Sequence, residues 1–508
     1  MSEQLALLPG YLAAHLGLTL VALTLGVCLS VPLGVLVSRR ARLEAAVLGV
    51  AGVIQTIPSL ALLAFMIPAL AAIGAPSIGA LPALIGLTLY SLLPVLRNTV
   101  AGLSGVDRAV LEAADGVGMT PRQRLWRVEL PLALPVIVAG VRTAAVWTVG
   151  TATLSTPVGA TSLGDFIFSG LQTRNYNSVL MGCLASAGLA LLLDGLVRGL
   201  GLAVARRSRR GIALCLVAFA GLGLFAAAPA LARLGQDEAP ITVGAKTFTE
   251  QYILSRILAG QITSHTGSAA RALDSLGSTV LFDALRSGEI DVGVDYSGTL
   301  ALTALGIADP GTDRALLLER VKGALASEHH VHLVAALGFE NTYALAMRAE
   351  HAARLGVSSI GGLAAHAPQL KVGGDYEIFQ RPEWRSLEQR YGLRFGEQRS
   401  MDPSLLYEAA RSEAVDVISA FSTDGRIVAY DLTVLDDDAH AIPPYDAVIL
   451  VSDRLMRTRP DVVEGLEALE GAIDASEMRR LNAAVDEDGE TPDAVARGWL
   501  AARSRPVR

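Results

Sequence analysis

The hydrophobic positions follow two different patterns along the chain. In the first part, apolar residues form six long runs, each close to the ~20 residues that a helix needs to cross the hydrocarbon of a membrane. These runs cover residues 12–37, 46–73, 78–96, 131–153, 178–197 and 211–232. From Ile241 onward, short runs rich in β-branched residues alternate with helical ones. The pattern predicts an α-helical transmembrane domain of about six spans, followed by an α/β domain.

The second part is expected to contain a parallel sheet, because strands alternate with helices. "ITVGAKTF" (241–248) predicts a strand and "TEQYILSRILAGQIT" (249–263) the helix after it. Further strands are predicted at "VGVDYSG" (292–298), "LKVGGDY" (370–376) and "VDVISAFSTDG" (415–425).

Charge separates the two parts and orients the first. Residues 1–239 carry a net charge of +6 and residues 240–508 a net charge of −13. The arginines of the first part gather after the first run, between the third and fourth, and between the fifth and sixth. Positively charged loops stay in the cytoplasm, so the α/β domain is expected outside a multi-pass inner (cytoplasmic) membrane domain. No basic stripe with interleaved aromatic residues indicates nucleic-acid binding.

The sixth run allows two interpretations. "RRSRRGIALCLVAFAGLGLFAAAPALA" (206–232) has a basic start, an apolar middle and small residues at its end, which are the parts of a secretory signal peptide. We expect it to be the last span, which with the linker up to residue 239 tethers the outer domain. Cleavage as an internal signal peptide is the alternative.

The residues with catalytic or metal-binding chemistry are sparse. The seven histidines of the outer part show no metal-ligand spacing, so neither a metal nor a cofactor is expected. The cysteines, Cys28, Cys183 and Cys215, all fall in predicted spans, which leaves the outer domain without a disulfide. No lysine lies in a G-x-x-x-x-G-K-[ST] loop, so ATP binding is not expected on this chain. The chain is therefore not expected to be an enzyme.

A charged segment between the third and fourth runs has a distinctive spacing. "EAADGVGMTPRQRLWRVELP" (112–131) resembles the motif by which ABC importer permeases couple to their ATPase. The matching residues are Glu112, Ala113, Ala114, Gly118, Leu130 and Pro131, within a cytoplasmic loop of residues 108–131. Small alanines allow close helix approach and Gly118 allows a bend. The resemblance implies docking on a separate ATP-binding cassette ATPase, and an ordinary amphipathic loop is the alternative.

Three more segments resemble one group of ABC importer permeases in particular. "IQTIPSLALLAFMIP" (54–68), "LTLYSLLPVLRNTVAGLSGVD" (87–107) and "GDFIFSGL" (164–171) are similar to the permeases of osmoprotectant importers, which take up glycine betaine, choline and carnitine. The similarity implies a permease domain at 1–205 that works as a homodimer with two ATPase copies. Pro58 and Pro94 are expected to break helices near a transport path, although each could equally be a packing kink.

The outer part resembles the substrate-binding proteins of the same family. The matching pieces are "GAKTFTEQ" (244–251), "DYSGT" (295–299), "ENTYALAM" (340–347), "AFSTDGRI" (420–427) and "IPPYDAV" (442–448). The resemblance implies a two-lobed, periplasmic-binding-protein-like domain at 240–508. Its first lobe would hold 241–346 and 447–508, and its second lobe 347–446.

A quaternary ammonium has no N–H to donate, but it binds well to aromatic ring faces. The family builds an aromatic cage, and the resemblance carries that role to Tyr296, Tyr343, Phe421 and Tyr445, each of which could instead be a core residue. The polar partners implied in the same way are Gln251, Thr299, Asn341 and Thr423.

The resemblance also implies that Arg381, in "GDYEIFQRPEW" (374–384), clamps a substrate carboxylate; a surface salt bridge is the alternative. Two departures from the family are visible. Phe421 stands where tyrosine is frequent, and Pro382-Glu383-Trp384 replaces the usual Asp-Gly. The substrate is therefore left open among glycine betaine, choline, carnitine and a larger betaine such as ergothioneine.

Three classes of function fit a membrane domain joined to an outer domain. A fused permease and receptor of an importer is favoured by segment 112–131. A membrane-anchored sensor needs only one or two spans and no coupling motif. A tethered enzyme would need a nucleophile–base pair or a metal cluster, and the outer part shows neither.

Overall fold

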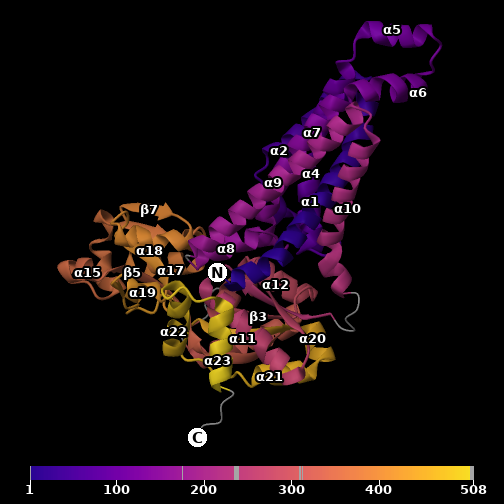
Figure 1. Ribbon diagram of the computed structural model, residues 1–508. Helices are drawn as coiled ribbons and strands as arrows, with labels where there is room; N and C mark the ends of the chain where they lie inside the picture. The colour runs from indigo at the N-terminus through magenta and orange to yellow at the C-terminus, as the bar shows by residue number, and fades with distance from the viewer. Residues whose placement is uncertain (1, 174, 234–238, 308–310, 312, 504–508) are drawn as a thin grey trace. The chain divides into compact units, whose positions relative to one another are not determined.

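The computed structural model describes residues 2–173, 175–233, 239–307, 311 and 313–503 of the 508-residue chain (Figure 1). The chain forms two compact units. The first holds Met1–Phe168 and Asn177–Glu238, and the second holds Ser169–Tyr176 and Ala239–Arg508. Residues 234–238 of the predicted linker lie outside the described residues.

Long apolar helices make up the first unit. The helices with spans long and apolar enough to cross a membrane are α1 (Ser2–Val37), α4 (Ala80–Ser104), α7 (Leu130–Ala152), α9 (Tyr176–Ala205) and α10 (Arg209–Arg233). A shorter pair, α2 (Ala41–Thr56) and α3 (Ser59–Ala71), passes the same test together but is bent by 98°. Within the described residues, five single-helix spans and one bent pair agree with the expected number of about six.

The two prolines singled out in the sequence behave differently. Pro58 lies at the bend between α2 and α3, as predicted for a helix break. Pro94 lies inside α4, which continues through it, so the prediction of a break there was wrong. Proline lacks an N–H, which frees the carbonyl oxygen of Tyr90 four residues earlier. The Gln55 side chain donates to that oxygen at 3.4 Å, so the helix continues without losing the contact.

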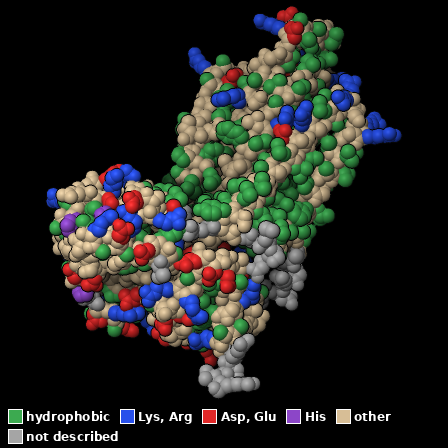
Figure 2. All heavy atoms as spheres, turned by 60° about the vertical axis from the view of Figure 1, so that its left-hand side comes forward, with side chains coloured by type: hydrophobic (Ala, Val, Ile, Leu, Met, Phe, Trp, Pro, Cys, Tyr) green, Lys and Arg blue, Asp and Glu red, His purple; other side chains and the backbone are tan. Residues whose placement is uncertain are grey.

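Small residues set the spacing between these helices. A Cβ on Gly34 of α1 would lie 2.7 Å from the side chain of Thr99 on α4, and one on Gly140 of α7 would lie 2.6 Å from Asn98. Such close backbone approach is typical of packing within a membrane. Outward-facing large apolar side chains remain exposed along α1, α9 and α10, and apolar side chains dominate the visible face of this unit in Figure 2.

The charged segment between α4 and α7 forms two short helices at one end of the bundle (Figure 1). α5 (Arg108–Gly116) is capped by Asp107, and α6 (Pro121–Arg124) by a capping box of Thr120 and Gln123. A π-helical turn, η1 (Leu125–Glu129), leads into α7.

The bend within this segment is at Gly118. Its φ is +77°, which confirms the turn expected there. Arg124 then ties the segment together through ion pairs with Asp115 at 2.5 Å and Glu129 at 2.8 Å. Ala114 is buried, whereas Val117 and Trp126 are largely exposed.

Two five-stranded sheets form two lobes in the second unit. The first sheet has the order β2-β1-β3-β10-β4 and the second β7-β6-β8-β5-β9. The strands of the first lobe are β1 (Ile241–Lys246), β2 (Ala270–Leu276), β3 (Val292–Tyr296), β4 (Val331–Glu340) and β10 (Asp446–Ser452). Those of the second are β5 (Tyr343–Arg348), β6 (Lys371–Gly374), β7 (Glu397–Ser400), β8 (Val417–Phe421) and β9 (Leu432–Val434).

Every strand predicted from the sequence is present, but the sheets are mixed rather than parallel. β10 runs antiparallel to β3 and β4, and β5 runs antiparallel to β8 and β9. The reason is that the chain crosses between the lobes twice, so β5 and β10 each enter a sheet from the other lobe. Residues 343–346, assigned above to the first lobe, pair in the second sheet.

Helices cover both lobes. The first lobe carries α11 (Thr249–Thr266), α12 (Ser278–Ser287), α13 (Ser297–Thr299), α14 (Arg314–Ala324), α20 (Asp453–Thr458), α21 (Pro460–Glu467), α22 (Ala475–Asp486) and α23 (Pro492–Arg503). The second carries α15 (Ala349–Leu355), α16 (Ile360–Ala364), α17 (Pro382–Tyr391), α18 (Pro403–Arg411) and α19 (Arg426–Ala429). β1, β3 and β10 are buried along their whole length, so they form the centre of the first core.

The two crossing segments lie side by side. The backbone N–H of Asn341 donates to the carbonyl oxygen of Tyr445 at 3.0 Å, and the N–H of Thr342 donates to Ser422 Oγ at 3.0 Å. The boundary between the lobes therefore gathers residues from four places in the chain. They lie just after β3 and β8 and just before β5 and β10.

Candidate substrate site

Five aromatic rings form a continuous group at the lobe boundary. Phe248 lies 6.2 Å from Tyr296 and 5.7 Å from Phe421 between ring centroids. Phe421 contacts Tyr343 at 4.9 Å, and Tyr343 meets Tyr445 edge to face at 6.1 Å. We call these five residues the aromatic cluster. It contains all four aromatic residues named from the sequence and one, Phe248, that was not.

Local structure fixes each ring of the cluster. Phe248 is the extended residue at which α11 begins, and Tyr296 is the last residue of β3. Tyr343 and Phe421 are direct partners across β5 and β8. Tyr445 packs so closely on α13 that a Cβ on Gly298 would lie 2.7 Å from its ring. Phe248 and Phe421 come from different lobes, so moving the lobes apart would separate these two rings.

A buried carboxylate, Glu250, organises the polar side of the cluster. Its Oε1 accepts hydrogen bonds from the Tyr296 hydroxyl at 2.5 Å and the Asn341 amide at 2.9 Å. Its Oε2 accepts from Thr423 at 2.5 Å and from Asn482 at 3.3 Å. Burial raises the pKa of Glu250, and these four donors oppose the shift by stabilising the charged form.

This network changes the interpretation of the predicted polar partners. Asn341 and Thr423 donate to Glu250, and the Gln251 amide donates to the Tyr296 hydroxyl at 3.1 Å. Their donor groups therefore hold the protein together at the lobe boundary. Thr299, the fourth predicted partner, is the buried last residue of α13.

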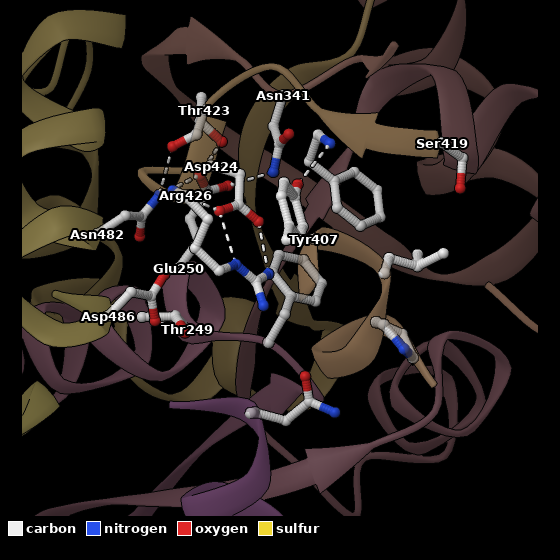
Figure 3. A pocket seen from close by; sticks show the side chains of 15 residues that line it. Thr249, Glu250, Asn341, Tyr407, Ser419, Thr423, Asp424, Arg426, Asn482 and Asp486 are labelled. Atoms are coloured by element: carbon white, nitrogen blue, oxygen red, sulfur yellow. Dashed lines mark hydrogen bonds and ion pairs between the residues drawn. The ribbon is translucent and has the colours of Figure 1, made fainter. Parts of the chain in front are cut away.

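A small pocket opens beside the cluster (Figure 3). Phe248, Glu250 and Phe421 line one part of it. Arg426 lines another, where its guanidinium binds Asp424 through two hydrogen bonds at 2.9 and 2.6 Å and stacks 4.1 Å from the Tyr407 ring centroid. Sequence reasoning did not single out Arg426 or Asp424, although both lie in the quoted segment "AFSTDGRI".

Arg381 lies against the cluster and is buried, and it pairs with one exposed carboxylate, Glu377, and one buried carboxylate, Glu383. Its guanidinium carbon is 5.1 Å from the Tyr343 ring centroid. Its Nε and Nη2 donate to Glu383 Oε1 at 3.1 and 2.9 Å, and its Nη1 donates to Glu377 at 3.3 Å. The Tyr445 hydroxyl donates to the same Glu383 oxygen. The guanidinium expected to clamp a substrate carboxylate is thus already paired with protein carboxylates.

Cations already contact the cluster at two rings. Besides Arg381 at Tyr343, the Lys246 Nζ lies 5.4 Å from the Tyr296 ring centroid and pairs with Asp295 at 2.5 Å. A cation over a ring face is stabilised by the ring's quadrupole. The cluster therefore has the geometry and the electron-rich faces that attract positive charge.

Two protein families match the chain. Residues 26–206 match the binding-protein-dependent transport system inner membrane component, and residues 239–502 match the substrate binding domain of the ABC-type glycine betaine transport system.

Individual relatives match either both parts or one. The ergothioneine transport permease/ergothioneine binding protein of Helicobacter pylori is 32% identical over 92% of this chain and 85% of its own length. The choline transport system permease protein of Bacillus subtilis is 43% identical over 35% of this chain and 80% of its own length. The carnitine transport binding protein of Listeria monocytogenes is 30% identical over 58% of this chain and 96% of its own length.

A solved structure, of a glycine betaine/carnitine/choline ABC transporter, is 32% identical, with a TM-score of 0.46, over 52% of this chain and 98% of its own. The two family matches and the Helicobacter pylori relative confirm a multi-pass inner-membrane permease joined to an extracytoplasmic binding domain, and a transport protein rather than an enzyme. The chain belongs to the betaine-type ABC importers in which the permease and its substrate-binding protein are fused in one polypeptide.

Proposed function

We propose that this chain captures a trimethylammonium compound at the aromatic cluster and passes it through its own permease domain. The observation that carries the proposal is a series of five aromatic rings from both lobes, each in contact with the next. A trimethylammonium group offers no hydrogen bond, so ring faces and apolar contact are the groups that can bind it. Glycine betaine, choline and carnitine all carry this group.

Binding would couple to lobe closure. Tyr296 and Tyr445 lie in the core of the first lobe with Phe248 packed against it, whereas Tyr343 and Phe421 pair in the sheet of the second lobe. A cation that contacts rings from both lobes favours the arrangement in which the lobes approach each other. Asn341 and Thr423 would support this arrangement through their hydrogen bonds to Glu250, and Gln251 through its hydrogen bond to the Tyr296 hydroxyl.

A larger betaine is the second candidate substrate. The relative that matches 92% of this chain, including both the permease and the receptor, is named for ergothioneine. Ergothioneine carries a trimethylammonium group, a carboxylate and an imidazole-thione ring, so the same aromatic cluster would serve it.

Transport would need a separate ATP-binding cassette ATPase. We place the docking contact at Glu112, Ala113, Ala114, Gly118, Leu130 and Pro131. The support is the α5–α6 hairpin with its turn at Gly118 and the exposed apolar side chains of Val117 and Trp126 beside it. Two copies of the chain with two ATPase copies would form the importer.

Titration of the full chain in lipid nanodiscs tests the proposal. Choline, glycine betaine, carnitine and ergothioneine are the ligands, and the Tyr343→Ala chain is the cluster variant. We expect at least one of these ligands to bind, with an affinity lowered by about 1–3 kcal/mol in Tyr343→Ala, because one ring face and its contact area are lost. Absence of binding by every trimethylammonium compound to the folded wild-type chain would refute the proposal.

A further inference from the structure

Glu383 is a buried carboxylate at the edge of the aromatic cluster, and only one of its two oxygens is used. It lies in the first turn of α17 and is 1% exposed. Its Oε1 accepts from Arg381 and from the Tyr445 hydroxyl. Its Oε2 is buried and has no hydrogen-bond partner among the described residues.

An unpartnered carboxylate oxygen in a buried position requires an explanation, because nearly all buried polar atoms have a partner. The neighbouring donor does not supply one. The Trp384 indole N–H donates to Glu388 at 2.9 Å instead. Glu383 therefore offers a free acceptor beside Tyr445 of the aromatic cluster and beside Arg381, which lies over the Tyr343 ring.

The charges around this acceptor disfavour a substrate carboxylate there. Arg381 is one positive charge, and it is shared between Glu383 and the more exposed Glu377. A ligand carboxylate approaching Arg381 would have to displace Glu383 and would meet its negative charge. A ligand that presents a hydrogen-bond donor is not repelled by Glu383 and can donate to its free oxygen.

We propose that Glu383 Oε2 accepts a hydrogen bond from the substrate, so that this chain selects quaternary ammonium compounds that also carry a hydrogen-bond donor. The inference rests on the proposed function and adds a specificity-determining residue to it. The donor is a hydroxyl, as in choline and carnitine, or a ring N–H, as in an imidazole-thione. Glycine betaine carries neither and binds less tightly.

The test compares choline with its O-methyl ether, which keeps the ammonium and loses only the donor. The full chain in nanodiscs is titrated with both, and with glycine betaine. We expect wild type to bind choline at least tenfold more tightly than the ether. If the wild-type chain binds the ether as tightly as choline, or more tightly, the inference is wrong. This result needs no variant.

Glu383→Gln provides the structural test. The amide oxygen must keep facing the donors Arg381 and Tyr445, so the NH₂ group takes the place of Oε2 and turns an acceptor into a donor. The choline-to-ether affinity ratio should then fall to about one or below, and glycine betaine should bind more tightly than to wild type. Glu377→Gln, which removes the other carboxylate on Arg381, is the matched control and should keep the wild-type ratio.

The outcomes separate this inference from the proposed function. If trimethylammonium compounds bind but Glu383→Gln keeps the wild-type ratio, Glu383 does not read the donor and only this inference fails. If no trimethylammonium compound binds the folded wild-type chain, both fail. Ergothioneine distinguishes a hydroxyl donor from a ring N–H donor. Its affinity falls in Glu383→Gln only if Glu383 accepts from the ring N–H.

Discussion

Phe248→Leu tests whether the aromatic cluster binds charge or only apolar surface. Leucine keeps much of the apolar volume but removes the ring face that Phe248 presents between Tyr296 and Phe421. The backbone need not change, because Phe248 is extended at the start of α11, where its φ and ψ of −153° and 158° suit any L-residue.

The expected size of the effect follows from one lost cation–π contact. Such a contact is worth about 0.5–2 kcal/mol, which corresponds to about a 2- to 30-fold change in affinity. This loss applies to the cation alone. A neutral ligand of the same shape loses only the difference in apolar contact between phenylalanine and leucine.

The assay is a titration of the full chain with choline and with 3,3-dimethylbutan-1-ol, which replaces the ammonium nitrogen of choline by carbon. The ratio of the two affinities measures the contribution of charge. Phe248→Leu should lower that ratio by the factor given above. Phe282→Leu is the control, since Phe282 is buried in the first lobe against His329 and is not part of the cluster. If Phe248→Leu weakens both ligands equally, the ring supplies only apolar contact and the reasoning is wrong.

Three further predictions concern coupling, pH and processing. Gly118→Asp should abolish uptake but leave ligand binding unchanged, because a side chain at φ +77° distorts the turn between α5 and α6; wild-type uptake would exclude the docking role. The raised pKa of Glu250 means that the folded state binds its proton more strongly than the unfolded state does. Lowering the pH from 7 toward 4.5 should therefore raise the melting temperature of wild type relative to Glu250→Gln, and parallel melting curves would contradict this. The segment 206–232 should remain uncleaved, so an immunoblot of membranes with a C-terminal tag should show one full-length band; a soluble fragment of the outer domain would support the signal-peptide alternative.

Periodicity predicted most of the secondary structure, because long apolar runs and short β-branched runs are local features. The failures come from contacts between distant residues. Pro94 lies inside a continuous α4, and Gln55, from another helix, donates to the carbonyl that proline leaves free. The sheets are mixed because β5 and β10 return from the opposite lobe, which strand–helix alternation cannot reveal.

The candidate site was predicted in part for the same reason. Tyr343 and Phe421 could be named because they lie in recognisable segments, and the structure pairs them across two strands. Phe248 lies in one of those segments but was overlooked, since only the fold places it between Tyr296 and Phe421. Arg381 and Glu383 are only two residues apart, but the contact of Glu383 with Tyr445 joins residues 62 positions apart, and no local pattern reports it.

The most direct test of the proposed substrate class is the affinity of the wild-type chain for choline compared with 3,3-dimethylbutan-1-ol. The two ligands share shape and hydroxyl group and differ in the positive charge. If the rings form a cation site, choline should bind at least tenfold more tightly, since several ring faces each contribute about 0.5–2 kcal/mol. Equal affinity for the neutral alcohol would show that the cluster is an apolar pocket and would contradict the assignment of a quaternary ammonium substrate.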